Sequence, residues 1–233
     1  MKDSYLTNLI FRVVVGLILC IFQGCSNEDK DPSTLDNTVK DKDGNVYHTI
    51  KIGLQVWMVE NLKTTKYNDG TTIPFVSDVS QWISLTTPAF CWYSNDEGIR
   101  NSNYGALYNY YAVNTGKLCP EGWHVPTTAE WNNFEDYLGG QSVAGGKLKQ
   151  TGTSNWLSPN TGATDEFGFS ALPGGGRIAN NGYYRYSNEE GNWWSSNGSI
   201  NNGDLRSITY DSPVLFNYTG SKRNGFSVRC IKD

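Results

Sequence analysis

Few residues in this chain have the types and spacing that catalysis requires. The 233 residues include two histidines and five cysteines. Neither His48 nor His124 belongs to a cluster spaced for a metal, and the sequence has no HExxH, CxxC or GxSxG motif. We therefore expect no metal, no cofactor and no catalytic residue. His124, between Trp123 and Val125, is assigned a structural role.

Aromatic residues amid polar ones are the second chemical feature, and they are typical of a carbohydrate site. The densest groups are Tyr183-Tyr184-Arg185-Tyr186 and Asn192-Trp193-Trp194. An aromatic face covers the apolar C–H groups of a sugar, while nearby amides bind its hydroxyls. Alternate residues of a strand point inward, so we place Trp194 in the core and expect Tyr184 and Trp193 at the surface. The candidate ligand-binding residues are Tyr183, Tyr184, Tyr186 and Trp193.

The setting of Cys25 predicts where the protein is located. Lys2 and Arg12 precede an apolar run over residues 13–22, which is shorter than the about 20 helical residues that a bilayer needs. The run fits the core of a secretory signal peptide over residues 1–24. The Gly24-Cys25 pair after it resembles a bacterial lipobox, which implies that Cys25 carries a lipid and begins the mature chain. An ordinary signal peptide with an incidental cysteine is the alternative.

Residues 25–43 are expected to be an acidic, flexible tether behind the lipid. Between Ser26 and Asp43 the chain has six acidic residues, three lysines and no aromatic residue, so this segment cannot bury a core. An acidic stretch after a lipidated cysteine resembles the surface-export signal of lipoproteins in the Bacteroides group. It implies an outer-membrane protein exposed at the cell surface, with the periplasmic face as the alternative.

Three cysteines remain for the exported part of the chain, where disulfides are stable. Cys91, Cys119 and Cys230 cannot all pair within one chain. We favour a bond between Cys119 and Cys230, which would tie the end of the chain to the body of the domain. The alternative is that all three stay reduced and buried.

The elements that position these residues begin at about Gly44, where the composition changes. Strand-like runs then alternate with Asn-Gly and Asp-Gly turns. Residues 47–52 and 55–59 predict an opening hairpin. Alternating apolar residues predict strands with one buried face at 214–218 and at 226–231. The glycine run at 174–177 is interpreted as a tight turn.

One helix is well defined by its sequence. Thr127 and Glu130 match a capping box, and Gly139-Gly140 would end the helix. A second short helix is predicted over residues 142–150. The apolar residues of the first helix share one face: Trp131, Phe134 and Leu138. These elements predict an α+β fold in which one or two helices pack on irregular antiparallel sheets with long loops.

Several ordered motifs resemble a known family. They are WMVENL at 57–62, YGALY at 104–108, CPEGWHVPT at 119–127, GFSALPGGGR at 168–177, WSS at 194–196 and FSVRC at 226–230. Together they are similar to the Fibrobacter succinogenes major paralogous domain, and we expect one such domain over residues 44–233. The resemblance implies a C-type-lectin-like fold, distantly similar to formylglycine-generating enzymes. It also implies that Cys91 is unpaired, because residues 101–103 lack the cysteine that often precedes the Tyr-Gly motif.

These patterns predict a surface lipoprotein, held to the membrane by its lipid, whose non-catalytic domain binds a glycan or a host or matrix protein. A nucleic-acid partner is not expected, because the net charge is -4. Two alternatives stay open. An enzyme of formylglycine-generating or glycan-modifying type would need reactive cysteines or a cleft lined by titratable groups. A structural or adhesion subunit would polymerise as its concentration rises.

Overall fold

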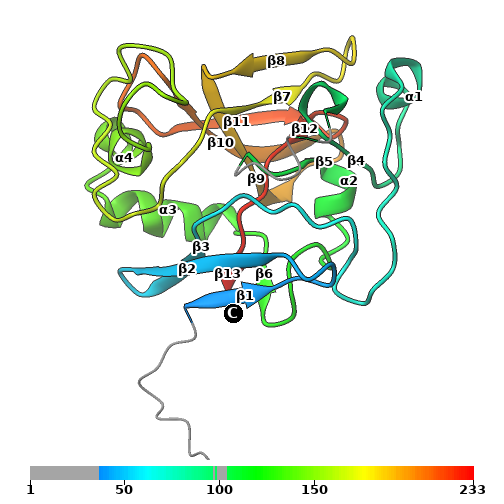
Figure 1. Ribbon diagram of the computed structural model, residues 1–233, viewed down its shortest axis with the longest axis horizontal. Coiled ribbons are helices and arrows are strands. Elements are labelled where there is room, and N and C mark those ends of the chain that lie inside the picture. Colours follow the sequence, from blue (N-terminus) through cyan, green and yellow to red (C-terminus); the bar gives the residue numbers. More distant parts are fainter. Residues whose placement is uncertain (1–36, 97, 99–103) are drawn as a thin grey trace, which may run out of the picture. The chain divides into compact units, whose positions relative to one another are not determined.

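The computed structural model describes residues 37–96, 98 and 104–233. In this part of the chain the fold is α+β, with four short helices and strands that pair antiparallel in three sheets (Figure 1). The α+β class expected from the sequence is confirmed. None of the helices in these residues is long and apolar enough to cross a lipid bilayer. The predicted signal peptide, Cys25 and residues 25–36 of the predicted tether lie outside the described residues.

One sheet collects strands from both ends of the described chain. Its order is β1-β2-β3-β13-β6. Strands β2 and β3 form the predicted opening hairpin, and β13 lies between β3 and β6, so the end of the chain completes this sheet (Figure 1). The strands are β1 at Thr38–Lys40, β2 at Val46–Ile52, β3 at Gln55–Met58, β6 at Trp123–His124 and β13 at Ile231–Lys232.

The fold begins earlier than the boundary predicted at residue 43. Strand β1 pairs with β2, and Asp41 holds the turn between them. The Asp41 carboxylate accepts hydrogen bonds from the Tyr47 hydroxyl at 2.6 Å and from the Asn45 backbone N–H at 2.9 Å. Asp43 accepts one from the backbone N–H of Thr65. Residues 38–43 therefore belong to the domain, and the prediction that they form a flexible tether is wrong.

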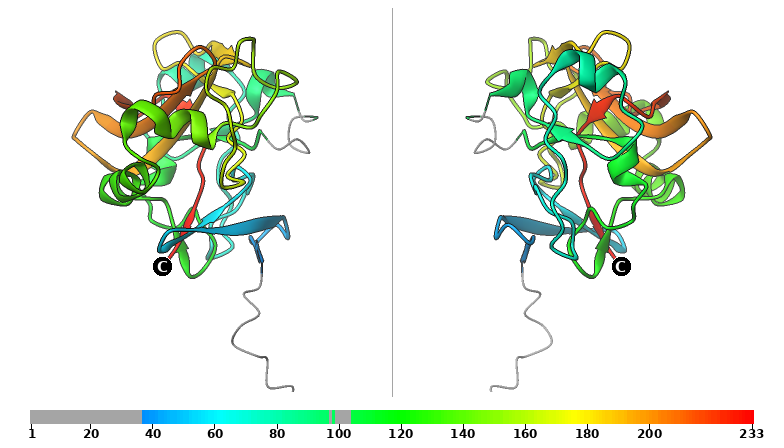
Figure 2. Two further views of the ribbon diagram at one scale, coloured as in Figure 1. Left: turned by 90° about the vertical axis from the view of Figure 1, so that its left-hand side faces the viewer. Right: turned by 90° about the vertical axis from the view of Figure 1, so that its right-hand side faces the viewer.

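A three-stranded sheet has the order β11-β10-β9. It consists of β9 at Glu190–Gly198, β10 at Asn202–Thr209 and β11 at Phe216–Ser221. The β9–β10 hairpin, drawn in orange, projects from the body in both views of Figure 2. The Asn-Gly pairs at 197–198 and 202–203 lie inside these two strands, so the turn of the hairpin falls between them rather than on them.

The remaining sheet has the order β4-β5-β12-β7-β8. Its strand β7 contains the glycine run that we interpreted as a tight turn, and that interpretation is wrong because β7 pairs with both β12 and β8. A Cβ on Gly176 would lie 2.5 Å from the Phe226 ring, so the close approach of neighbouring elements requires glycine. The strands are β4 at Phe90–Cys91, β5 at Leu107–Asn109, β7 at Gly174–Arg177, β8 at Tyr184–Ser187 and β12 at Gly225–Phe226.

The C-terminal segment differs from the predicted half-buried strand. Strand β12 ends at Phe226, and the chain then passes through the interior to β13 (Figure 1). Ser227 and Arg229, the polar residues that alternate with apolar ones in the predicted strand, are each 1% exposed, so the prediction of a single buried face is wrong. Buried residues surround this segment, so its alternating side chains all point into the interior and none of them faces solvent. The predicted buried face at 214–218 is also wrong, because Leu215 is buried while Tyr218 is exposed.

The helices agree with the sequence pattern. Thr127 caps α3 at Thr128–Tyr137 through a complete capping box with Glu130, and Trp131 and Phe134 are buried. Helix α4 follows at Gln141–Leu148, close to the predicted 142–150. Three shorter elements complete the described helical structure: α1 at Val79–Ile83, a 3-10 turn at Tyr93–Asn95 and α2 at Tyr110–Val113.

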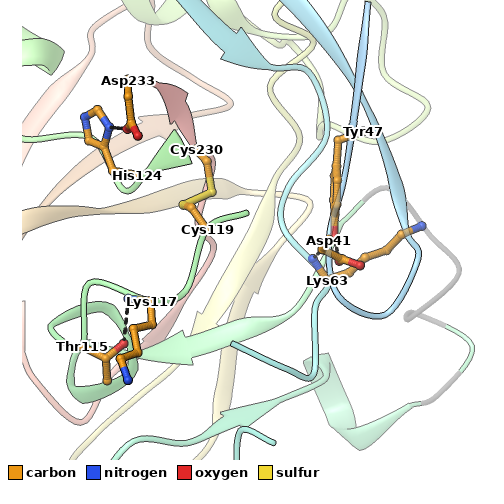
Figure 3. Close-up of a disulfide and its surroundings, with 9 residues drawn as sticks. All are labelled: Asp41, Tyr47, Lys63, Thr115, Lys117, Cys119, His124, Cys230 and Asp233. Carbon is orange, nitrogen blue, oxygen red and sulfur yellow. Dashed lines mark hydrogen bonds and ion pairs between the residues drawn. A yellow bond between two sulfur atoms is a disulfide. The ribbon is translucent and has the colours of Figure 1, made fainter. Parts of the chain in front are cut away.

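A disulfide joins Cys119 to Cys230 across 111 positions, as predicted (Figure 3). It links the loop before β6 to the residue just before β13. Cys91 is free and buried, which confirms what the family resemblance implies for it. Burial raises the pKa of the Cys91 thiol to about 11, with Arg177 acting in the opposite direction.

Candidate ligand-binding groove

A groove of about 610 Å³ lies between the first turns of α3 and strands β10 and β11. Polar side chains of both charge signs line it together with one exposed tyrosine. Grooves of this size with a few converging polar groups are the usual setting of a small-ligand site. The lining residues are Thr128, Asn132, Asp204, Arg206, Asn217, Tyr218 and Thr219.

Strand register brings the groove's polar residues together. Asp204 lies opposite Thr219, and Arg206 lies opposite Asn217, in the β10–β11 ladder. Two residues that lie directly opposite each other on neighbouring strands share one face of the sheet. Residues two positions apart on the same strand also share a face. Helix α3 begins beside this face, because Thr128 donates its hydroxyl hydrogen to Asp204 Oδ2 at 3.0 Å.

Tyr218 lines the groove at the edge of β11, where it lies opposite Leu205, so alternation directs its ring to the sheet face opposite that of Asn217 and Thr219. It lies on β11, the edge strand of its sheet, and is 53% exposed. Its ring stacks on Phe216 with 5.6 Å between the ring centroids and 9° between the planes. This contact holds the ring in one orientation.

Arg206 forms the buried end of the groove. It is only 2% exposed, and its Nη2 donates to Asn132 Oδ1 at 2.6 Å. Its Nε is buried and has no hydrogen-bond partner among the described residues. Burial lowers the pKa of Arg206, while the carboxylates of Glu135 and Asp204 act in the opposite direction. A buried cation with an unused donor is an unusual feature, since buried polar groups are normally paired.

The groove offers both donors and acceptors of hydrogen bonds. Asp204 accepts hydrogen bonds, Arg206 donates them, and the amides of Asn132 and Asn217 can do both. Among the described residues there is no group of three or more histidine, cysteine, aspartate or glutamate side chains that could hold a metal ion.

The four aromatic residues predicted from sequence do not come together in this groove. Tyr183 and Tyr186 are 57% and 42% exposed, and they lie at β8, the edge strand of a different sheet. Tyr184 is partly buried, because its ring covers the Arg177 guanidinium at 5.1 Å and its hydroxyl donates to Asn95 Oδ1 at 2.6 Å.

Trp193 is buried, so the expectation of an exposed ring is wrong. It is 1% exposed, and its Nε1 donates to Asn61 Oδ1 at 2.8 Å. Trp194 is fully buried, as predicted. The physical reason is that β9 lies between two hydrophobic clusters, one containing Trp193 and the other Trp194. Successive side chains of β9 therefore point into two different hydrophobic clusters, and neither side of the strand at Trp193 and Trp194 faces solvent.

Several family-like motifs meet at Arg229, inside the protein. The Arg229 guanidinium donates from Nε and Nη2 to Asn61 Oδ1, at 3.3 and 3.0 Å, and from Nη1 to the Phe169 carbonyl. Its carbon Cζ lies 4.1 Å from the centroid of the Phe169 ring. Burial lowers the pKa of Arg229 to about 9. These residues are buried, so their role is to join the segments of the fold.

His124, which we assigned a structural role, contacts two carboxylates from different parts of the chain. Its Nδ1 lies 2.6 Å from Asp233 Oδ1 and its Nε2 lies 2.9 Å from Glu130 Oε1 (Figure 3 shows the Asp233 contact). Burial opposes protonation, but the hydrogen bonds to Asp233 and Glu130 outweigh it and raise the pKa of His124. The imidazole thus connects the start of α3 with the last residue.

Comparison with known proteins gives a family but no close relative. No curated protein matches the chain, and no solved structure matches it either. The family model described as the Fibrobacter succinogenes major domain matches residues 50–232. That range contains the buried Asn61–Arg229 cluster, the Cys119–Cys230 disulfide and all seven residues that line the groove. Since the match extends over most of the sequence and the motifs in it build the core, the chain belongs to the Fibrobacter succinogenes major domain family.

Proposed function

We propose that this protein is a lipid-anchored envelope protein whose domain binds carbohydrate in the groove between α3 and β11, without catalysing a reaction. The observation that carries the proposal is the polar groove itself, in which the β10–β11 register brings Asp204 and Asn217 to one sheet face beside Asn132 of α3. Carboxylate and amide side chains can accept and donate the hydrogen bonds that sugar hydroxyls make. In this site the Arg206 and Asp204 side chains are already held by Asn132 and Thr128.

The anchor in this proposal is Cys25. The signal peptide at 1–24 would be removed, and acyl chains on Cys25 would insert into the outer membrane, each buried methylene contributing about 0.8 kcal/mol. Residues 26–37 would then span from the lipid to β1, which starts at Thr38. We place the domain on the cell surface because of the acidic residues after Cys25, with the periplasmic face as the alternative. Within the α+β class we propose a C-type-lectin-like fold, supported by the motif resemblance.

The anchor is tested separately from binding. Mass spectrometry of the protein from its native membrane should find Cys25 acylated at the mature N-terminus. Protease treatment of intact cells should remove the domain if it faces outward and leave it intact if it faces the periplasm. An unmodified Cys25 on a chain with its leader uncut would contradict the anchoring proposal.

The binding test starts with a glycan array and the full chain carrying Cys25→Ser, followed by calorimetric titration of the glycans that bind. Tyr218→Ala should weaken binding several-fold, because a residue that lines the edge of the groove is lost. Tyr183→Ala is the matched control, since Tyr183 is exposed to a similar extent, 57% against 53%, but lies at β8.

The outcomes of that test distinguish the two surfaces. Weaker binding in Tyr218→Ala alone supports the groove. Weaker binding in Tyr183→Ala alone would move the site to the aromatic cluster first predicted from the sequence. A blank array would contradict carbohydrate binding.

A further inference from the structure

The most exposed large apolar side chain among the described residues is Leu54, at the turn of the β2–β3 hairpin. It is 98% exposed. A small cavity of about 220 Å³ opens beside it, between this turn and helix α3. Unlike the groove, the cavity has no side chain in its lining that is charged at neutral pH. The lining residues are Ile52, Gly53, Leu54, Gln55, Asn133 and Tyr137.

Tyr137 extends this uncharged surface from the hairpin turn onto α3. Its side chain is 56% exposed. A Cβ on Gly53 would lie 3.0 Å from Tyr137 Cδ2, so the tyrosine ring rests on the backbone of the turn. The ring also contacts Phe167, with 5.8 Å between the ring centroids. We call Leu54 and Tyr137 the hairpin-tip patch, and contiguous exposed apolar surface of this kind marks an interaction site.

Strand register places the hairpin-tip patch at the end of the sheet where the chain enters the domain. Strand β1 is antiparallel to β2, with Thr38 opposite His48, and the Asn37 carbonyl accepts a hydrogen bond from the Thr49 N–H at 2.8 Å. Because β2 runs from His48 toward the hairpin turn, the chain followed back to Asn37 runs toward that turn as well (Figure 1). Leu54 is five positions beyond Thr49, which is about 17 Å at strand spacing.

The anchor proposed at Cys25 brings a bilayer to the same end of the domain. Twelve positions separate Cys25 from Asn37. A chain extends by at most about 3.4 Å per residue, so this segment spans no more than about 40 Å. A short connection of this kind keeps the anchored surface at a high effective concentration. The bilayer is therefore the apolar surface that the hairpin-tip patch meets most often.

We propose that the hairpin-tip patch rests on the membrane that carries the protein's own anchor. Leu54 reaches the boundary between headgroups and acyl chains, and the Tyr137 hydroxyl stays among the headgroups, where tyrosine is enriched in membrane proteins. This inference rests on the anchoring part of the proposed function and adds a second, non-covalent contact with the bilayer. The contact sets which end of the domain faces the membrane.

The test anchors the chain to vesicles by a route that does not need acylation. The protein is the chain from residue 25, which contains every described residue, with Cys25→Ser and an N-terminal histidine tag. The vesicles contain phosphatidylethanolamine, phosphatidylglycerol and a nickel-chelating lipid. A fluorophore is attached at Leu54→Cys or, as the matched control, at Ile200→Cys. Ile200 is 91% exposed and lies in the turn between β9 and β10, which belong to a different sheet.

The introduced thiol is the one that reacts with the fluorophore. Cys91 is buried, and Cys119 and Cys230 are bonded to each other. Leu54 and Ile200 are almost wholly exposed, so neither substitution removes a core contact. Thermal unfolding checks that each variant is folded.

Lipids brominated in their acyl chains quench a fluorophore that reaches the hydrocarbon. The label at position 54 should lose about half of its emission or more, because the patch enters the acyl boundary, and the label at position 200 should keep its emission. Tyr137→Ser should reduce the quenching at position 54. Tyr183→Ser is the matched control, since Tyr183 is 57% exposed but lies at β8, and it should leave the quenching unchanged.

Each outcome bears on a different part of the inference. Quenching at position 54 that is no greater than at position 200 would overturn the membrane contact. Self-association of the chain without vesicles, lost in Leu54→Asp, would assign the patch to a second copy and would also overturn it. An acylated Cys25 in the native membrane without quenching at position 54 would leave the anchoring proposal intact and overturn this inference alone. An unmodified Cys25 would overturn both.

Discussion

A single side-chain oxygen, Asn61 Oδ1, connects three distant parts of the chain. It accepts hydrogen bonds from Trp193 Nε1 and from two nitrogens of Arg229. Arg229 is 1% exposed and has no carboxylate within ion-pair distance among the described residues. A buried cation is tolerated only when its hydrogen-bond donors are satisfied. The Asn61 side-chain amide and the Phe169 carbonyl accept the hydrogen bonds of Arg229 in place of a carboxylate.

Replacing Asn61 by leucine should therefore be severe. Asn61→Leu keeps the approximate volume but leaves Arg229 and Trp193 with unpaired buried donors, and we expect the free energy of unfolding to fall by about 3 kcal/mol. Asn217→Ala, at an exposed position in the groove, is the control and should change the free energy of unfolding by about 0.5 kcal/mol or less. Urea denaturation measures both. A loss below about 1 kcal/mol in Asn61→Leu would show that Arg229 is satisfied in another way.

His124 should make stability depend on pH. Its pKa in the folded protein is raised above the ordinary value of 6.5 by Asp233 and Glu130, although burial opposes this. The contribution of His124 is therefore fully present below about pH 6.5 and is lost as the pH rises through the higher folded-state pKa. Urea denaturation at about pH 6 and pH 9 should show a stability difference between wild type and His124→Gln that shrinks at the higher pH.

The other histidine provides the control for that measurement. The side chain of His48 is 67% exposed and pairs with Glu60 in contact with solvent, where ion pairs contribute little. His48→Gln should change stability less than His124→Gln does at pH 6. A difference for His124→Gln that stays constant or grows with pH would contradict the assignment.

At the scale of elements, the predictions that succeeded rest on contacts between near neighbours in sequence. The helix from Thr128 was predicted because Thr127 and Glu130, three residues apart, satisfy the helix start by themselves. The glycine run at 174–177 was misinterpreted because its reason lies elsewhere in the chain. Arg185 and Phe226 leave no room for a side chain there, and a single sequence does not reveal such non-local neighbours.

The groove illustrates the same limit for function. Its residues come from α3, β10 and β11, and only the strand register places Arg206 opposite Asn217. The alternation of Asp204, Leu205 and Arg206 was a usable signal, because it is typical of a strand with one polar face. We instead predicted Trp193 because aromatic residues are dense around it, and Trp193 is buried in one of the two hydrophobic clusters.

Strand β7 gives a test of why glycine is needed. Gly175 has φ +60°, and a Cβ on it would lie 2.3 Å from the Arg185 carbonyl oxygen. Gly116 has a similar φ of +69° but nothing within 4 Å of the corresponding Cβ position. Alanine at either site pays about 1 kcal/mol of backbone strain, and Gly175→Ala should lose about 2 kcal/mol more because strand pairing must shift.

Thermal and urea unfolding of Gly175→Ala and Gly116→Ala compare the two effects directly. Equal losses would mean that backbone conformation alone explains the glycine. A larger loss of stability in Gly175→Ala would show that the difference between the two variants comes from the close approach of β8.

At the scale of the whole molecule, the described domain is closed by its own end. Strand β13 pairs with β3 from near the start of the domain and with β6 from its middle. Such pairings are distant in sequence, so forming them is entropically unfavourable in a chain without cross-links. The Cys119–Cys230 bond lies next to β13 and β6, where it reduces the freedom that the unfolded chain would otherwise have.

Removing this disulfide should therefore act mainly on the unfolded state. For a loop of 111 positions, a chain-entropy account gives a loss of about 4.7 kcal/mol in unfolding free energy for Cys119→Ala/Cys230→Ala. Cys91→Ala is the control, because it removes a buried sulfur without removing a cross-link.

The slope of unfolding free energy against urea concentration separates the loss of a cross-link from the loss of a packing contact, since an unlinked chain exposes more surface on unfolding. The slope should rise in the double variant and stay constant in Cys91→Ala. An unchanged slope in both would mean that the bond acts through native packing, as any other buried contact does.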